Sequence, residues 1–299
     1  MNKRQIIGAL LLLLTAIIWG FAFVAQKTGL QHIGPCTFNG VRSIIGGIAL
    51  LPCIMFLDML KGRSPSIFGE TSPDGRRTLL IGGVCCGVIL GFASLLQQTG
   101  IQHTSVGKAG FITTLYIMIV PIIGLFFHRR MSIVKWICVF VTVFGMYLLC
   151  FKGGGGKLNK GDVIVFLSSF VFACHILTID HFAGRVDCVR MSCIQFFMAG
   201  IVSLLLALPL EKIVWDDIMK AGVPILYAGV MSSGVAYTLQ VVAQRDVHPV
   251  IASLIMSLES VFAAIGGWLL LHERLSASET CGCIIIFAAV ITAQLPERR

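Results

Sequence analysis

Residues 251–271 read IASLIMSLESVFAAIGGWLLL, an apolar run with a single charged residue, Glu259, near its middle. A helix needs about 20 predominantly apolar residues to cross the hydrocarbon core of a bilayer. The length and composition of this run therefore predict a membrane-spanning helix. Glu259 lies eight residues into it, which at ~1.5 Å per residue puts the carboxyl group roughly 12 Å deep, near the bilayer midplane.

Similar apolar runs recur along the whole chain. Of its 299 residues, 57% are hydrophobic and 12% are charged, whereas a soluble domain is typically about 25% charged. This composition excludes a soluble or nucleic-acid-binding protein and leaves no room for a soluble domain. Runs separated by charged residues, Gly or Pro predict ten spans, at 6–26, 36–60, 79–97, 108–127, 134–151, 162–179, 192–210, 223–243, 251–271 and 281–295.

The distribution of Lys and Arg predicts how the chain lies in the membrane. An even number of spans puts both termini on one side, and 14 of the 23 Lys and Arg residues fall on that side. Eight fall on the other side, and Arg42 lies within a span. Because cytoplasmic loops carry an excess of positive charge, we expect a multi-pass protein of a bacterial-type inner (cell) membrane with both termini in the cytoplasm.

The centre of the chain divides it into two stretches of similar length. Residues 153–160 form a Gly- and Lys-rich linker between 1–152 and 161–299. A shift of 144 positions lays HRRMS at 128–132 on HERLS at 272–276. With five spans each, the second half enters the membrane in the opposite sense, as in many secondary transporters. The sequence therefore predicts an all-α integral membrane fold of ten helices in two inverted five-helix repeats.

Three acidic or basic side chains lie well away from the ends of predicted spans, where each costs roughly 2.5–3.5 kcal/mol on insertion scales. Glu259 is either a substrate contact or proton carrier, or a structural carboxyl group bonded to a neighbouring helix. His175 titrates near neutral pH when unperturbed, which suits proton exchange, although a packed histidine explains it equally well. Arg42 either extends its side chain toward the outer surface or pairs with an acid or an anionic substrate.

Uncharged polar side chains in apolar runs add candidates for a cavity, although such side chains also bond helices together. The candidates are Trp19, Asn39, Gln97, Tyr116, Gln195 and Tyr237. Weaker examples are Gln98, Thr113, Thr114, Tyr227 and Gln240. In the fourth span, Pro121 and Gly124 are candidates for a bend or gate, and close helix packing is the alternative interpretation.

Motifs of common enzyme sites are missing from the sequence. There is no HExxH, GxSxG or GxxxxGK[ST] motif, so we predict no enzymatic activity, no cofactor and no metal site. The alternatives left open are an integral membrane enzyme and a channel-like or sensory membrane protein without transport.

Several segments together resemble the EamA-type branch of the drug/metabolite transporter superfamily. In the first half they are Trp19-Gly20, Phe23-Val24-Ala25, Pro35 with Phe38, Asn39 and Arg42, Gln97-Gln98 with Gly100, and the segment from Lys108 to Pro121. In the second half they are Gly161-Asp162, Ala173 with His175-Ile176, Val186-Asp187, Gln195-Phe196, and Leu258-Glu259 through Ala263 to Leu275. The resemblance runs nearly from end to end.

This resemblance implies a single-chain helix bundle around a central cavity, working by alternating access and commonly exporting amino acids, other metabolites or toxic compounds. Two positions depart from the family pattern: Ser260 replaces a frequent Pro, which puts a helix bend after Glu259 in doubt, and Arg129 replaces a frequent acid. The resemblance fixes neither substrate nor oligomeric state, so a homodimer stays open. One mid-membrane carboxyl makes proton coupling a hypothesis, with facilitated diffusion as the alternative.

Overall fold

The computed structural model describes residues 3–62, 64, 66–69, 72–104, 106–126, 132–150, 159–271 and 277–294. Every regular element in these ranges is helical. Three features of the sequence lie outside them: residues 153–158 of the linker, most of the repeated motif (128–131 and 272–276), and Arg129. The division into two five-helix repeats therefore stays a prediction.

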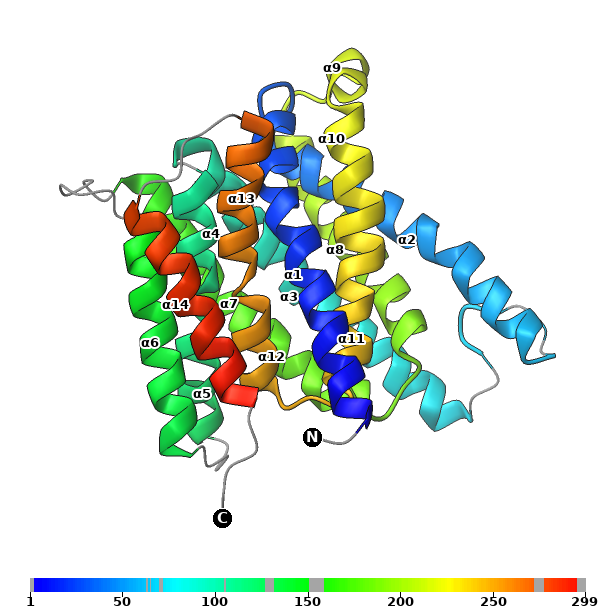
Figure 1. Ribbon diagram of the computed structural model, residues 1–299. Helices are drawn as coiled ribbons and strands as arrows, with labels where there is room; N and C mark the ends of the chain where they lie inside the picture. Colours follow the sequence, from blue (N-terminus) through cyan, green and yellow to red (C-terminus); the bar gives the residue numbers. More distant parts are fainter. Residues whose placement is uncertain are drawn as a thin grey trace.

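Fifteen helical elements follow one another along the described chain (Figure 1). The first half contains α1 (Lys3–Gly29), α2 (Pro35–Leu60), α3 (Pro73–His103), α4 (Val106–Thr114), α5 (Tyr116–Phe126) and α6 (Ile133–Cys150). The second contains α7 (Lys160–Ala183), α8 (Cys188–Leu210), α9 (Trp215–Lys220), α10 (Gly222–Leu226), the π-helix η1 (Tyr227–Tyr237), α11 (Thr238–Gln244), α12 (Pro249–Met256), α13 (Glu259–Leu271) and α14 (Ala277–Gln294).

Eight helical stretches of the described chain are long and apolar enough to cross a membrane. They are Lys3–Gly29, Pro35–Leu60, Pro73–His103, Ala109–Phe126, Lys160–Ala183, Cys188–Leu210, Gly222–Gln244 and Pro249–Leu270, and each coincides with a predicted span. The spans expected at 134–151 and 281–295 fall on α6 and α14, where the apolar helices are shorter. The count of ten therefore remains a prediction.

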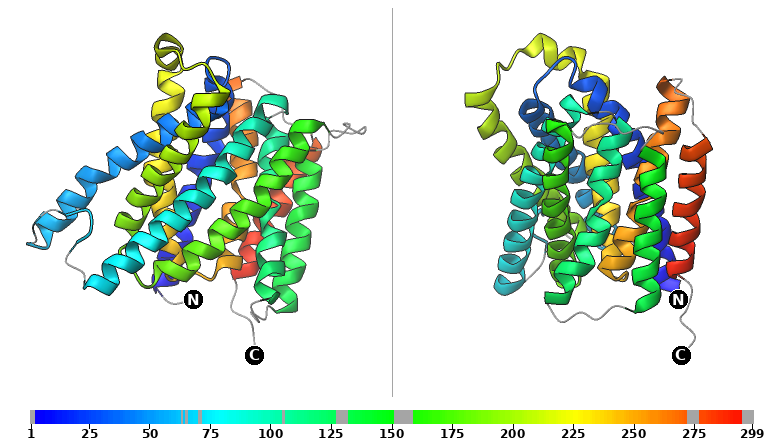
Figure 2. Two further views of the ribbon diagram at one scale, coloured as in Figure 1. Left: turned by 180° about the vertical axis from the view of Figure 1, so that it is seen from behind. Right: turned by 90° about the vertical axis from the view of Figure 1, so that its left-hand side faces the viewer.

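Helices from the two halves of the chain interleave. The most extensive contacts join α2 to α8, α3 to both α7 and α8, α6 to α14, and α1 to α13. Figure 2 shows the pair formed by α6 and α14 along one side of the bundle, with the strongly tilted α2 reaching out on the other. The start of α1 and the end of α14 lie at the same end of the bundle (Figure 1).

Charged side chains hold α2 against α8 at both ends of the pair. At the start of α2, the Glu211 carboxylate accepts hydrogen bonds from the backbone N–H groups of Cys36 (2.7 Å) and Thr37 (2.8 Å). A helix start leaves such groups without intrahelical partners. At the other end, Arg190 in the first turn of α8 forms an ion pair with the buried Asp58. These polar contacts therefore stabilise the packing of α2, from the first half, against α8, from the second.

Small residues allow α1 to lie directly against α13, and α3 against α8. A Cβ atom on Gly20 would come within 2.7 Å of the backbone carbon of Phe262 and 2.8 Å of the nitrogen of Ala263. A Cβ atom on Gly87 would come within 2.6 Å of the carbonyl oxygen of Gln195. Close approach of this kind is how transmembrane helices gain contact without a hydrophobic driving force.

One predicted span is broken directly before Glu259, because α12 ends at Met256 and α13 begins at Glu259. Three serine hydroxyls around the break donate to backbone carbonyl oxygens three residues earlier. These bonds are Ser253 to Val250 (2.9 Å), Ser257 to Leu254 (2.7 Å) and Ser260 to Ser257 (2.9 Å). Such bonds compete with the helical ladder and bend helices. The break lies before Glu259, whereas α13 runs without interruption from Glu259 to Leu271, so a bend after Glu259 does not occur in this structure.

A second break lies in the first half, where Leu115 separates α4 from α5. The N–H of Leu115 bonds the carbonyl oxygen of Ile112 at 3.2 Å, a three-residue spacing that tightens the turn. The shift of 144 positions that aligns the halves also lays Leu115 on Glu259. Under this shift the two breaks lie within two positions of each other. Pro121 and Gly124 lie further along α5 and are buried, and their role in gating stays a prediction.

Candidate functional site

A cavity lies between the two helix breaks and is lined by residues from both halves. The cavity volume is about 30 Å³, and the figure rises to about 460 Å³ when the space open to the outside is included. Its lining consists of Trp19, Phe23, Gln26, Arg42, Gln97, Thr113, Tyr116, Phe172, His175, Ile176, Ser232, Tyr237, Gln240, Met256 and Glu259. Seven of the nine cavity candidates from the sequence are among them. The other two, Asn39 and Gln195, lie behind the wall and contact lining residues.

Glu259 and Tyr116 face each other across the cavity, each at the first position after a helix break. The Tyr116 hydroxyl donates a hydrogen bond to Glu259 Oε1 at 3.3 Å. Both side chains are buried, with residue exposures of 3% for Tyr116 and 4% for Glu259. In the described part of the chain the carboxyl group has no cationic partner. Glu259 is therefore a shielded acid that one phenol group holds in place.

Arg42 lines the cavity from α2 and is 2% exposed, so its guanidinium does not extend to the outer surface. Its Nε donates to Asn39 Oδ1 at 2.9 Å, and Asn39 Nδ2 donates to Ser203 Oγ at 2.8 Å. Asn39 therefore orients the guanidinium from behind. Within the described residues, no carboxylate pairs with Arg42.

His175 enters the cavity from α7 and is 1% exposed. Its Nε2 lies 3.2 Å from Gln195 Oε1 on α8. With the amide in this orientation the imidazole donates through Nε2, so Gln195 fixes the ring from behind as Asn39 fixes Arg42.

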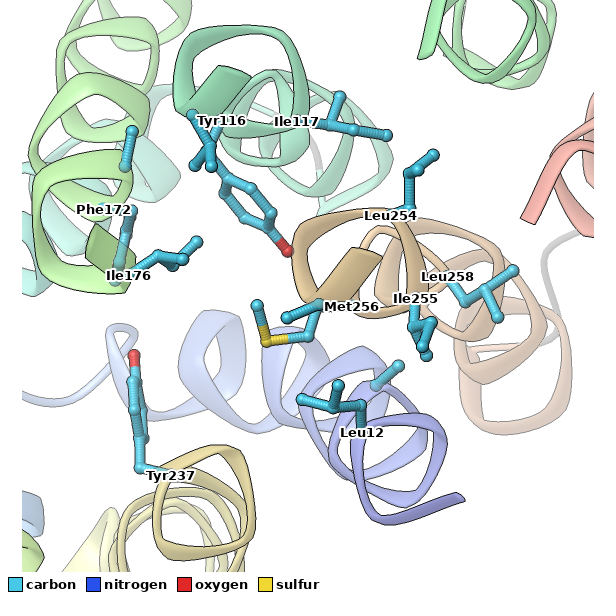
Figure 3. Packing of buried hydrophobic residues seen from close by; sticks show 14 of the residues in the cluster. Leu12, Tyr116, Ile117, Phe172, Ile176, Tyr237, Leu254, Ile255, Met256 and Leu258 are labelled. Carbon is cyan, nitrogen blue, oxygen red and sulfur yellow. The ribbon is translucent and has the colours of Figure 1, made fainter. Parts of the chain in front are cut away.

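Aromatic rings form one wall of the cavity. The ring centroids of Trp19 and Tyr237 lie 4.5 Å apart, and that of His175 lies 5.9 Å from Tyr237. Trp19 Nε1 donates to the backbone oxygen of Ser232 in η1 at 3.4 Å. Figure 3 shows the hydroxyls of Tyr116 and Tyr237 directed into the same central space, with Met256 beside it. π-helical segments are frequent at functional sites, and η1 supplies two of these lining residues.

Two buried amide groups complete the polar lining. Gln26 and Gln240 each present a side-chain oxygen that is buried without a hydrogen-bond donor in the described structure. A buried acceptor without a donor costs roughly 1–3 kcal/mol, so these oxygens are available to N–H or O–H groups of a bound molecule. Gln97, by contrast, donates to Thr113 Oγ1 at 3.1 Å.

Some lining residues carry no recognisable signal in the sequence. Gln26 marks only the end of the first predicted span, and Ser232 resembles any small polar residue in a helix. The apolar lining residues Phe23, Phe172, Ile176 and Met256 have no feature that separates them from lipid-facing neighbours. Within the described residues there is no group of three or more His, Cys, Asp or Glu side chains that could hold a metal ion.

Comparison with known proteins identifies a family over nearly the whole chain. The EamA-like transporter family matches residues 6–151 and residues 159–293. A protein of Archaeoglobus fulgidus named "Uncharacterized transporter" is 27% identical over 98% of this chain and 87% of its own length. The Bacillus subtilis "Uncharacterized transporter YoaV" is 22% identical over 92% of each chain.

Two further comparisons bear on location and fold. The Escherichia coli "Uncharacterized inner membrane transporter YedA" is 23% identical over 97% of this chain and 92% of its own length. A protein crystal structure superposes with a TM-score of 0.75 over 98% of this chain and 96% of that chain, at 14% identity. That identity level supports a shared fold and no more.

Proposed function

Because the chain belongs to the EamA-like transporter family, we propose that it is a secondary carrier that exports small metabolites across the cell membrane by alternating access. Transport agrees with the names of the relatives. The substrate class, the export direction and the mechanism are our proposal, for which the buried cavity between the halves provides the support.

The observation that carries the mechanism is the Tyr116–Glu259 hydrogen bond between two broken helices. α5 belongs to the first half and α13 to the second, and each presents its first residue to the cavity. Discontinuous helices at the midplane are a frequent basis of binding sites in secondary transporters. Rocking of one half against the other would separate these two residues. The hydrogen bond can therefore form when the cavity opens to one side and break when it opens to the other.

Glu259 is the group through which we propose coupling to protons. It is a buried acid, held by Tyr116, with no cation attached in the described chain. The other titratable or charged side chains that line the same cavity are Arg42, Tyr116, His175 and Tyr237. Because a proton neutralises the Glu259 carboxylate, uptake of a proton would change the charge of the cavity and with it the binding of substrate. Facilitated diffusion is the alternative energy source.

The test compares metabolites inside and outside cells that overexpress either the unaltered protein or the Glu259→Gln variant at equal membrane levels. The control is Asp217→Asn, which changes an exposed carboxylate in α9. A compound that leaves cells only with the unaltered protein and the control supports an exporter that uses Glu259. Equal export by all three proteins would support the carrier function and show that Glu259 has no role in the transport mechanism.

Coupling to protons needs a separate measurement in sealed vesicles. An imposed pH gradient should accelerate transport of the identified compound by the unaltered protein and have no effect on Glu259→Gln. Transport by Glu259→Gln that still follows the gradient would overturn coupling at this residue.

A further inference from the structure

A second cavity lies along the first turns of α3 and shares no residue with the central one. Its volume is about 560 Å³, and it is lined by Pro73, Arg76, Arg77, Leu80 and Ile81. Figure 2 shows the start of α3 at the end of the bundle that also carries the N-terminus, beside the outward-leaning end of α2. The cavity therefore lies where α3 enters the membrane.

The two arginines of this cavity are available to an anion. Arg76 and Arg77 are exposed, and within the described residues neither forms an ion pair. The guanidinium carbon of Arg76 lies 5.2 Å from the centre of the Phe68 ring, and this contact orients the planar group. Stacking covers the face of a guanidinium group and leaves the N–H groups at its edge free to donate. Two neighbouring guanidinium groups of this kind suit the oxygens of a phosphate group.

An apolar stripe runs from the arginines toward the centre of the membrane. Leu80, Ile81 and Val84 follow Arg77 at spacings of three, four and seven residues, so the four side chains share one face of α3. All three apolar side chains are exposed. They lie in the span predicted at 79–97, and α3 is one of the helices long and apolar enough to cross a membrane. The surface beside them is therefore suited to hydrocarbon chains.

We propose that this cavity binds an anionic phospholipid. Its phosphate group accepts hydrogen bonds from Arg76 and Arg77, and its acyl chains lie along Leu80, Ile81 and Val84. Basic pockets at the membrane surface are a recurrent way in which membrane proteins bind anionic headgroups. The inference depends on neither the substrate nor the mechanism of the carrier.

Other occupants match only one part of this surface. A free anion such as inorganic phosphate would pair with the arginines and leave the apolar stripe without a partner. A phospholipid with a choline headgroup would bring a cationic group close to two guanidinium groups, and like charges at short range repel. A phospholipid with a net negative charge satisfies both the basic and the apolar part.

The first test measures lipid binding to the purified, unaltered protein by native mass spectrometry in an uncharged detergent. Phosphatidylglycerol is compared with phosphatidylcholine that carries the same acyl chains. An arginine near the membrane surface contributes enough to an anionic lipid to change its affinity about 5-fold. We therefore expect the tightest phosphatidylglycerol to bind roughly 5- to 30-fold more strongly than phosphatidylcholine. Equal binding of the two lipids would overturn the proposal.

Competition distinguishes a lipid from a free anion as the occupant. Inorganic phosphate and glycerol phosphate carry the anionic group without acyl chains, so neither should displace bound phosphatidylglycerol at a concentration where the same lipid does. Phosphatidylglycerol with shorter acyl chains should bind more weakly. Displacement by glycerol phosphate that equals displacement by the lipid would assign the cavity to a soluble anion and overturn the lipid site.

Substitutions then locate the site. The double variant Arg76→Gln/Arg77→Gln should lose the preference for phosphatidylglycerol, and Arg76→Lys/Arg77→Lys should keep part of it, since the charge remains. The matched control is Lys3→Gln/Arg4→Gln, which removes the same charge from exposed positions at the start of α1. A preference that persists in the Gln variant of α3, or that falls equally in the control, would contradict the assignment. The measurements on the unaltered protein do not depend on how these variants fold.

Discussion

The hydroxyl of Tyr116 and Oε1 of Glu259 lie 3.3 Å apart, although 143 positions separate the two residues in the sequence. Each residue begins a helix directly after a break, one in each half of the chain. The bond therefore joins two sites of interrupted backbone at the centre of the bundle. The strength of this hydrogen bond depends on the relative position of the two halves. Substitution of either residue measures how much the bond contributes to stability.

Tyr116→Phe keeps the aromatic ring and removes the only described donor to Glu259. Because a buried acceptor then lacks its partner, we expect the free energy of unfolding to fall by roughly 1–3 kcal/mol. In a Glu259→Gln background the same substitution should cost less, since the carboxyl acceptor has already been replaced by an amide. Chemical unfolding of the four proteins in detergent measures the difference. Strictly additive effects of the two substitutions would show that the bond contributes nothing.

Eight of the ten expected spans were predictable, because an apolar run of this length is long enough to cross a bilayer and too long for most buried helices of soluble proteins. Seven cavity residues were also predictable, since polar and charged side chains inside such runs need a partner or a cavity. Asn39 and Gln195 were predicted to line the cavity but lie behind lining residues. The sequence does not give the rotation of a helix about its axis, because that rotation depends on the neighbouring helices. Asn39 hydrogen bonds to Arg42 and Ser203, and Gln195 lies beside His175.

The break before Glu259 could not be predicted from familiar helix-breaking residues. Serine is common in membrane helices, and a hydroxyl that bonds a carbonyl three residues earlier leaves no distinct sequence pattern. Three such hydroxyls, those of Ser253, Ser257 and Ser260, cluster around the break. The apolar lining was equally hidden, because Phe172 and Met256 differ from lipid-facing residues only in their position.

Gly20→Ala should destabilise the protein because the added methyl group has no room. Its Cβ would lie 2.7 and 2.8 Å from backbone atoms of α13, which cannot move as a flexible side chain can. Overpacking of this kind typically costs roughly 1–3 kcal/mol. Gly184→Ala is the control, since a Cβ there meets nothing within 4 Å. Equal unfolding midpoints for the two variants would contradict the close contact of α1 with α13.

Glu211→Ala should weaken the start of α2. The Glu211 carboxylate accepts from the N–H groups of Cys36 and Thr37 and also from the Thr37 hydroxyl at 2.7 Å. Loss of a side-chain cap typically costs roughly 0.5–2 kcal/mol, and we expect a lower unfolding midpoint of that order. Asp216→Ala, an exposed acid in α9, is the control. Faster hydrogen exchange confined to the first turn of α2 would identify the cause, and unchanged exchange there would exclude it.

The orientation of the chain predicts which segments each side of the membrane can reach. The start of α1 and the end of α14 lie at one end of the bundle, and α9 lies at the other (Figure 1). With the excess of Lys and Arg on the side of the termini, a fluorescent protein fused to the C-terminus should fluoresce in the cytoplasm. A protease site inserted between Ile213 and Val214, just before α9, should be cut only from outside intact cells. Cleavage that requires opened cells would invert the topology and with it the direction assigned to export.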